Sequence, residues 1–226
     1  MRRLDMEYRA LFFSLLGMCL AAPLLGSAIY GYGILEFTTM AVLGGAVAIS
    51  SRDSGTRWVC LTLGVAAVLT SIVSRRVQSV PLAHLQAILL ALFLAYVAWI
   101  VLRAVLRSPQ VTTQELFGAL SVYLLLGMTW VFLYALCLLS DAGALRFPQG
   151  QFERITDLAA HGVAIQDLTY FSFVTLSTLG YGDIVPVSPV ARTLAWMEAV
   201  FGQLFLAVLV ARLVASLSLR PQGPRT

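Results

Sequence analysis

Six consecutive residues near the carboxyl-terminal end have types and spacing suited to binding a bare cation. Residues 178–183 read TLGYGD, so glycine alternates with a larger residue at 180 and 182. Glycine adopts positive φ at little cost, which lets successive carbonyl groups turn to one side of an extended backbone instead of alternating. The sequence therefore predicts a column of backbone oxygens, which can replace the water molecules around a cation.

The segments on either side of this motif are strongly apolar. The 226-residue chain is 59% hydrophobic and 12% charged, and its mean hydropathy is +0.87. These values exclude a soluble globular protein. The fifteen basic residues are all arginine, and they give a net charge of +4 without a basic run. The composition therefore does not favour a nucleic-acid partner.

Six stretches approach or pass the length of about 20 apolar residues that a helix needs to cross a bilayer. They are 10–29, 34–49, 58–73, 82–102, 116–139 and 190–219. A seventh apolar segment, 168–179, is too short to span and is interpreted as re-entrant. We therefore predict an all-α integral membrane protein with six transmembrane helices. A re-entrant pore helix and the TLGYGD motif are expected between the fifth and the sixth.

The distribution of arginines predicts the orientation of these helices. With the amino terminus in the cytoplasm, ten of the fifteen arginines lie on the cytoplasmic side, as the positive-inside rule requires. The prediction is a multi-pass protein of the cell membrane with both termini cytoplasmic. A signal peptide over the first apolar stretch is the alternative, disfavoured because no clear small-residue cleavage region follows it.

The motif resembles the selectivity filter of potassium channels, in which valine is more common where Leu179 stands. The resemblance extends over 116–219, within a pore domain (111–226) that follows a four-span peripheral domain (1–110). It implies that K⁺ is bound by backbone carbonyls and one side-chain hydroxyl, with no cofactor beyond this permeant ion. The implied filter residues are Thr178, Leu179, Gly180, Tyr181 and Gly182, of which the first four supply carbonyls and Thr178 also its hydroxyl.

The resemblance also implies roles for residues around the filter. Asp183 would attract cations at the outer mouth. Tyr181 would point away from the ions and pack behind the filter, against Tyr170 or Phe171. The pore helix, expected over 167–177, would direct the negative end of its dipole at the cavity. Asp167 suits the N-cap of that helix, but we favour an ordinary exposed carboxylate at this position.

The sixth span is expected to line the cavity and form the gate. Helical spacing of three and four places Gln203, Leu206, Val210 and Val214 on one face. Gly202, twenty residues after Gly182, is either a hinge or a site of close helix packing. Glu198 needs a partner, because an unpaired carboxylate at mid-membrane costs roughly 2.5–3.5 kcal/mol. The sequence does not name that partner.

Each chain supplies one filter segment, whereas a ring of carbonyls around an ion needs several, so we predict a homotetramer in the lipid bilayer. The fourth span carries Arg103 and Arg107 only at its cytoplasmic end, which predicts weak voltage dependence. Two alternatives stay open: a voltage-gated potassium channel with a degenerate sensor, and a secondary cation transporter. An enzyme is not expected, since the chain has two histidines, His84 and His161, and neither an HExxH nor a GxSxG motif.

Overall fold

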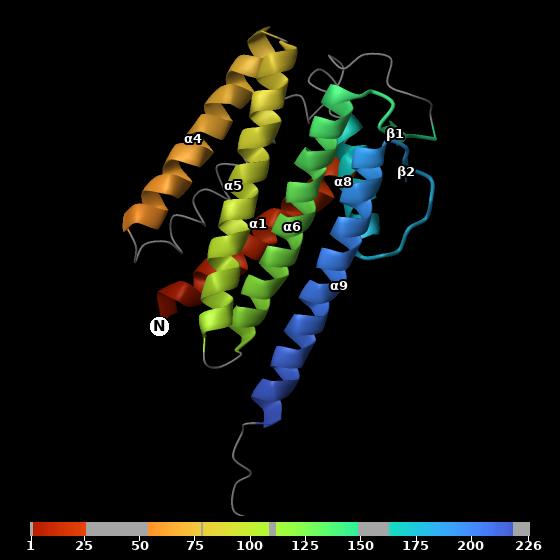
Figure 1. Cartoon of the computed structure of the whole chain (residues 1–226). Helices are drawn as coiled ribbons and strands as arrows, with labels where there is room; N and C mark the ends of the chain where they lie inside the picture. The colour runs from red at the N-terminus through yellow and green to blue at the C-terminus, as the bar shows by residue number, and fades with distance from the viewer. Residues whose placement is uncertain (1, 26–53, 78, 109–111, 149–162, 219–226) are drawn as a thin grey trace, which may run out of the picture.

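The computed structural model describes residues 2–25, 54–77, 79–108, 112–148 and 163–218. In these ranges Figure 1 shows a bundle of long helices with a small two-stranded sheet at one end. The helices are α1 (Arg2–Leu25), α4 (Ser54–Val77), α5 (Val80–Arg107), α6 (Thr113–Ser140), α8 (Val163–Leu176) and α9 (Pro189–Ser218), and the strands are β1 (Leu145–Arg146) and β2 (Val185–Pro186).

Four of the described helices are long and apolar enough to cross a membrane. These spans are Gly55–Ser74 in α4, Val80–Arg107, Thr113–Ser140 and Pro189–Ala215 in α9. They correspond to the third to sixth predicted spans, so the chain is an all-helical, multi-pass membrane protein. Helix α1 overlaps the first predicted span, and the second lies outside the described residues. The count of six spans therefore stays a prediction.

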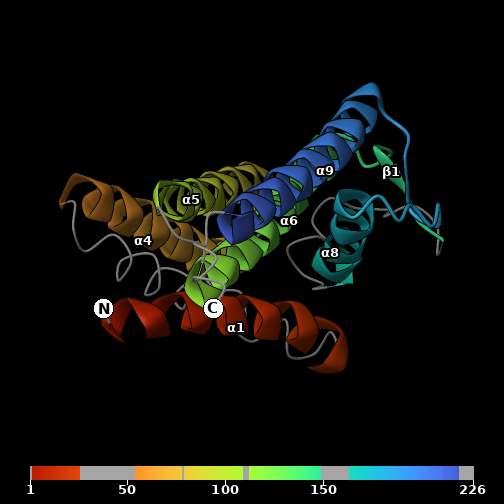
Figure 2. The same ribbon diagram turned by 90° about the horizontal axis from the view of Figure 1, so that it is seen from below.

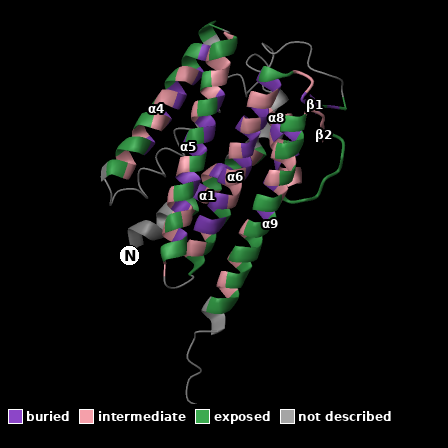
Figure 3. Ribbon diagram, viewed as in Figure 1, coloured by how far each residue is buried: buried purple, intermediate pink, exposed green. Residues whose placement is uncertain are grey.

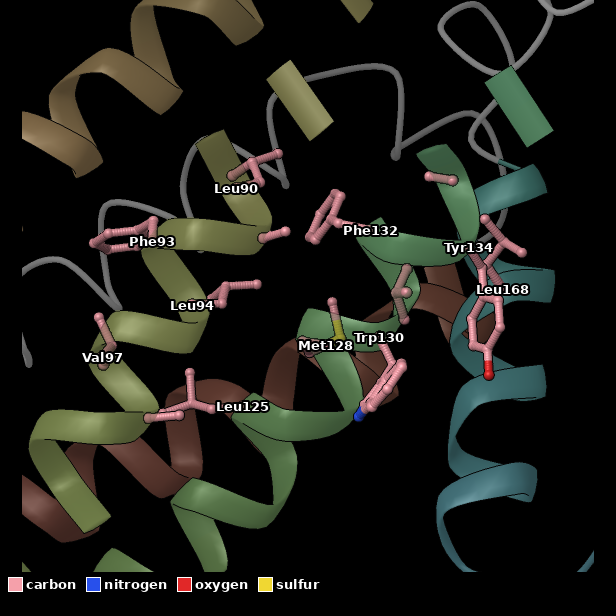
Figure 4. Packing of buried hydrophobic residues seen from close by; sticks show 14 of the residues in the cluster. Leu90, Phe93, Leu94, Val97, Leu125, Met128, Trp130, Phe132, Tyr134 and Leu168 are labelled. Atoms are coloured by element: carbon pink, nitrogen blue, oxygen red, sulfur yellow. The ribbon is translucent and has the colours of Figure 1, made fainter. Parts of the chain in front are cut away.

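Helix α5 lies between α4 and α6 in two perpendicular views (Figures 1 and 2). The centre of the hydrophobic core is the α5–α6 interface, where Leu94 of α5 lies opposite Leu125 and Met128 of α6 (Figure 4). Helix α4 packs on α5 and keeps a large apolar face exposed, which includes Trp58 and Leu69. The buried core thus centres on α6, the helix that also contacts α8 and α9.

The start of α6 is fixed by a capping box. The Gln114 N–H donates to the Thr112 hydroxyl over 3.3 Å, and the Thr112 N–H donates to the Glu115 carboxylate over 2.9 Å. These bonds satisfy amide groups that the first turn leaves without helical partners.

Helix α1 crosses α6 obliquely and reaches α8 (Figure 2).

Helix α8 has 14 residues, too few to span a bilayer, and packs against both α6 and α9. It begins at Val163, four residues before the expected start, so Asp167 does not cap the helix, and the Asp167 side chain is partly buried rather than exposed. The four residues before Asp167 contain no helix breaker and continue the helical hydrogen bonding by one more turn. Asp167 therefore lies inside the helix.

The segment that follows the motif is tied back to the end of α6. Strands β1 and β2 pair antiparallel with Leu145 opposite Pro186, and the Val187 N–H donates to the Ala144 carbonyl over 2.8 Å. Helix α9 then starts at once, because Ser188 accepts the Ala191 N–H over 3.1 Å and proline occupies the first helical position. Both ends of the motif are therefore anchored.

The long α9 helix is mostly uncovered in a single chain (Figure 3). In its most apolar window only 11% is buried, compared with 61% in α6. Exposed large side chains occur on several sides of it, among them Trp196, Leu204 and Val210. Helix α9 therefore presents apolar surface that one subunit does not cover.

Candidate functional site

The backbone of the TLGYGD motif alternates in the sign of φ. The angle is +59° at Thr178, +58° at Gly180 and +78° at Gly182, whereas Leu179 and Tyr181 do not have positive φ. The two glycines adopt positive φ without a steric cost, whereas at Thr178 this conformation costs about 1–2 kcal/mol of free energy. Alternation of this kind turns successive carbonyl groups toward the same side. The motif thus has positive φ at every second residue from Thr178 to Gly182.

Amide groups of the motif are directed at the carboxyl end of α8. The Leu179 and Gly180 N–H groups donate to the Val174 carbonyl over 2.9 and 3.3 Å, and the Thr178 N–H donates to the Thr175 carbonyl over 2.9 Å. A trans peptide unit points its N–H and C=O in opposite directions, and no cis bond is found in the described residues. The carbonyls of Thr178 and Leu179 therefore point away from α8.

Gln203 of α9 contacts the first residue of the motif. Its Nε2 donates to the Thr178 hydroxyl oxygen over 3.1 Å, and both side chains are exposed in the single chain. The residue predicted to be the polar member of the cavity thus lies at the base of the predicted filter. Leu206, Val210 and Val214 are also exposed and follow it at helical spacing.

The other end of the motif is held by Tyr170 of α8. Its hydroxyl donates to Asp183 Oδ2 over 2.7 Å, and this bond holds the pKa of Asp183 below its usual value, so the carboxylate stays ionised. Tyr181 is 67% exposed, so its expected packing against Tyr170 or Phe171 is not found. The Tyr170 hydroxyl instead bonds to Asp183. The buried Phe171 ring instead packs edge-on against Tyr134, with ring centroids 4.9 Å apart.

Two glycines let the neighbouring helices approach α8 closely. A Cβ at Gly202 of α9 would lie 2.2 Å from the Leu176 carbonyl oxygen, and one at Gly127 of α6 would lie 2.8 Å from the Phe173 ring. Of the two functions considered for Gly202, the contact supports close packing. Helix α8 is therefore wedged between α6 and α9 at positions where no side chain fits.

Glu198 of α9 is fully buried where α6, α8 and α9 meet. Its Oε2 accepts the Tyr134 hydroxyl proton over 2.6 Å, and its Oε1 lies 2.5 Å from the Ser172 hydroxyl. Figure 4 shows the Tyr134 ring on the side of α6 that faces α8. These are the partners that the sequence could not name. The one available signal was Ser172 itself, a hydroxyl between two phenylalanines.

Residues 119–218, which include most of α6 and all of α8, the motif and α9, match a family model described as "Ion channel". A curated relative, the inward rectifier potassium channel Kirbac3.1 of Paramagnetospirillum magnetotacticum, is 44% identical over 49 residues. Residues 119–218 therefore resemble the pore-loop potassium channel superfamily. The match to the relative covers 22% of this chain and 17% of that protein. No solved structure matches the chain with significance.

Arg212, which sequence reasoning did not single out, joins helix α9 to the end of helix α5. Arg212, near the far end of α9 from the motif, donates through Nη2 to the carbonyl of Ser108, which ends α5. The Ser108 hydroxyl donates in turn to Glu115 of α6 over 3.0 Å. Ser108, which follows α5, is therefore bonded directly to both α9 and α6.

Substituting Asp183→Asn should lower the unitary conductance of the channel at low ionic strength and have little effect at high ionic strength. The ionised carboxylate raises the local cation concentration, and salt screens this attraction over about 10 Å at 0.1 M. Recordings in planar bilayers at two salt concentrations measure the effect. Arg146→Gln, an exposed charge removed from β1, is the control for charge loss on the same surface. Equal conductance of Asp183→Asn and wild type at low salt would contradict this role.

Proposed function

We propose that the chain is the subunit of a homotetrameric channel that conducts K⁺ passively and selectively. The observation that carries the proposal is the alternation of positive φ at Thr178, Gly180 and Gly182, with amide groups held by the Val174 carbonyl. Four such segments around one axis would surround an ion with carbonyl oxygens in place of water. The bacterial relative is a potassium channel, which supports K⁺ as the ion.

In this proposal α8 is the re-entrant pore helix and α9 the inner helix. The carbonyls of Thr178, Leu179, Gly180 and Tyr181 bind K⁺ together with the Thr178 hydroxyl, which accepts a hydrogen bond from Gln203. The carboxyl end of α8 adds about half a negative charge near the base of the filter, which favours a cation there. Both termini lie in the cytoplasm, and the helices before α6 form a peripheral domain.

Two uncovered features support assembly from several copies. Tyr181 is 67% exposed, and an apolar hollow of about 460 Å³ opens beside Leu179, between Cys19 of α1 and Phe173 of α8. Large exposed aromatic side chains and apolar hollows are typical of surfaces that a partner covers. A neighbouring copy in closed fourfold symmetry is the occupant that the proposal requires.

The proposal is tested with purified protein in liposomes that hold a K⁺ gradient. We expect K⁺ flux that exceeds Na⁺ flux by at least about tenfold, with unitary currents in planar bilayers, since carbonyl rings discriminate between these ions. Native mass measurement of the same sample should show four copies. Saturable uptake coupled to a second ion would instead identify a secondary transporter, and a conducting monomer or dimer would exclude the fourfold pore.

The open probability of the channel should depend weakly on voltage. Moving one charge through the membrane field is worth about 2.3 kcal/mol per 100 mV, and steep gating takes about three to four charges per subunit. Arg103 and Arg107 lie in the last turns of α5 and are exposed. Steady-state recordings over a wide voltage range measure this. A steep rise within a few tens of millivolts that Arg103→Gln flattens would identify a degenerate voltage sensor instead.

A further inference from the structure

The cluster around Glu198 contains fewer protons than its hydrogen bonds need if the carboxyl group is ionised. The Ser172 hydroxyl lies 2.9 Å from the Gly127 carbonyl oxygen and 2.5 Å from Glu198 Oε1. A hydroxyl has one proton, and a carbonyl oxygen can only accept. When Ser172 donates to Gly127, the short bond to Glu198 forms only if Oε1 carries a proton of its own. All four groups, including Tyr134, are then satisfied.

The surroundings of Glu198 favour this neutral form. The residue is 0% exposed, and no arginine among the described residues acts on it. On α6 the facing titratable group is Tyr134, with Tyr123 further along the helix. On α8 the facing group is Ser172, which does not titrate, and Asp167 lies five residues earlier. A buried carboxylate without a cation is costly, and protonation removes that cost.

The cluster also acts on the part of α8 that holds the filter. Ser172 lies two residues before Val174, whose carbonyl accepts the Leu179 and Gly180 amides. On α9, Glu198 lies one turn before Gly202, which touches the Leu176 carbonyl. Glu198 and Gly202 therefore contact α8 from the same face of α9. The bonds of Glu198 set where α8 lies, and α8 sets where the filter amides are held.

We propose that Glu198 is a positioning residue for ion selectivity, which as a protonated acid joins α6, α8 and α9 behind the filter. The proposal rests on the proposed potassium-channel function. Without its own proton, the Glu198 carboxylate would accept the Ser172 hydrogen bond in place of the Gly127 carbonyl, which keeps only its partner within α6. The hydrogen bond that ties α8 to α6 is then lost. The bonded form is intact at neutral pH and is lost as the pH rises. Selectivity should therefore weaken at alkaline pH.

The test compares the K⁺ over Na⁺ permeability ratio of variants in liposomes at neutral and alkaline pH. Wild type should lose selectivity by roughly tenfold as the pH rises, the size expected for the loss of one hydrogen bond in the buried cluster. Glu198→Gln, which keeps the shape and a donor group, should retain the neutral-pH ratio at both pH values. Glu198→Ala should have the low ratio at both. Glu115→Gln, the same chemical change at the other end of α6, should titrate like wild type.

Two results would overturn the proposal. An unchanged ratio in Glu198→Ala would show that the residue does not position the filter, and an alkaline loss that persists in Glu198→Gln would assign the titration to another group. If Glu198→Ala does not assemble, Ser172→Ala and Tyr134→Phe take its place, because each removes one hydrogen bond of the cluster. An unchanged permeability ratio in both variants would show that the cluster does not position the filter. A wild type that never selects K⁺ would refute the proposed function instead.

Infrared spectroscopy tests the proton without reference to conduction. The purified channel at neutral pH should show the carbonyl stretch of a protonated carboxylic acid, which Glu198→Gln removes and Glu115→Gln retains. This band should disappear as the pH rises. Its absence from the wild-type spectrum at neutral pH would show that Glu198 is ionised and would overturn the proposal.

Discussion

Replacing Gly180 by alanine should abolish selectivity for K⁺ over Na⁺ while the helices stay folded and inserted. Gly180 has a φ of +58°, and a Cβ there would meet no atom within 4 Å. The effect is therefore one of backbone conformation, which costs an L-residue about 1–2 kcal/mol in each subunit. Relief of this strain rotates the peptide unit and turns a carbonyl out of the column. We expect the K⁺ over Na⁺ permeability ratio in liposomes to fall at least about tenfold, because 1.4 kcal/mol corresponds to a factor of ten.

Gly17→Ala is the matched control for this substitution. A Cβ at Gly17 of α1 also meets no atom within 4 Å, and its φ is not positive. That variant should keep wild-type selectivity, since alanine in a helix is favoured over glycine. If Gly180→Ala selects K⁺ as wild type does, residues 178–182 are not the filter.

Substituting Gly202→Ala should eliminate conduction and destabilise the assembled channel. The new Cβ would lie 2.2 Å from the Leu176 backbone oxygen and 3.0 Å from its Cδ1. A backbone oxygen at the end of α8 cannot rotate away, so α8 or α9 must move as a whole. Overpacking of this kind typically costs about 1–3 kcal/mol in each subunit. Flux in liposomes and thermal denaturation of the assembled form followed by native gel measure the two effects.

Gly127→Ala serves as the graded comparison. Its Cβ would lie 2.8 Å from the Phe173 ring, a side chain that can shift where a backbone carbonyl cannot. The loss of stability should therefore be smaller than for Gly202→Ala. Gly202→Ala with wild-type flux and stability would contradict the close packing and leave the hinge as the function of this glycine.

The sequence predicts local features of the motif well. The positive φ at Gly180 and Gly182 follows from residue type alone. Helical spacing places Gln203 on one face of its helix, but it does not predict the hydrogen bond from Gln203 to Thr178. Four of the predicted spans coincide with observed helices, because about 20 apolar residues leave few alternatives. The start of α8 lies four residues before the predicted one for a local reason, since helix ends are set by several competing groups.

Contacts between distant residues could not be predicted in this way. Tyr134 and Glu198 are 64 residues apart, and Arg212 and Ser108 are 104 apart. Periodicity shows which face of a helix is apolar, but it does not show which neighbouring helix lies against that face. The positive φ of Thr178 cannot be predicted from residue type, because threonine avoids this conformation and here the hydrogen bonds to α8 stabilise it.

The uncovered surface of α9 bears on how such a protein is made in the cell. Lipid tails are as apolar as leucine, so a newly inserted subunit can hold this helix against lipid without the penalty that water would impose. The motif differs, because polar backbone from Thr178 to Gly182 is exposed in the single chain and each unsatisfied group in hydrocarbon costs several kcal/mol. Newly synthesised subunits would then be stable in the bilayer as helices but not as pores. Quality control in the membrane could recognise exposed polar backbone. It would then detect an unassembled subunit by its motif, and not by the larger apolar surface of α9.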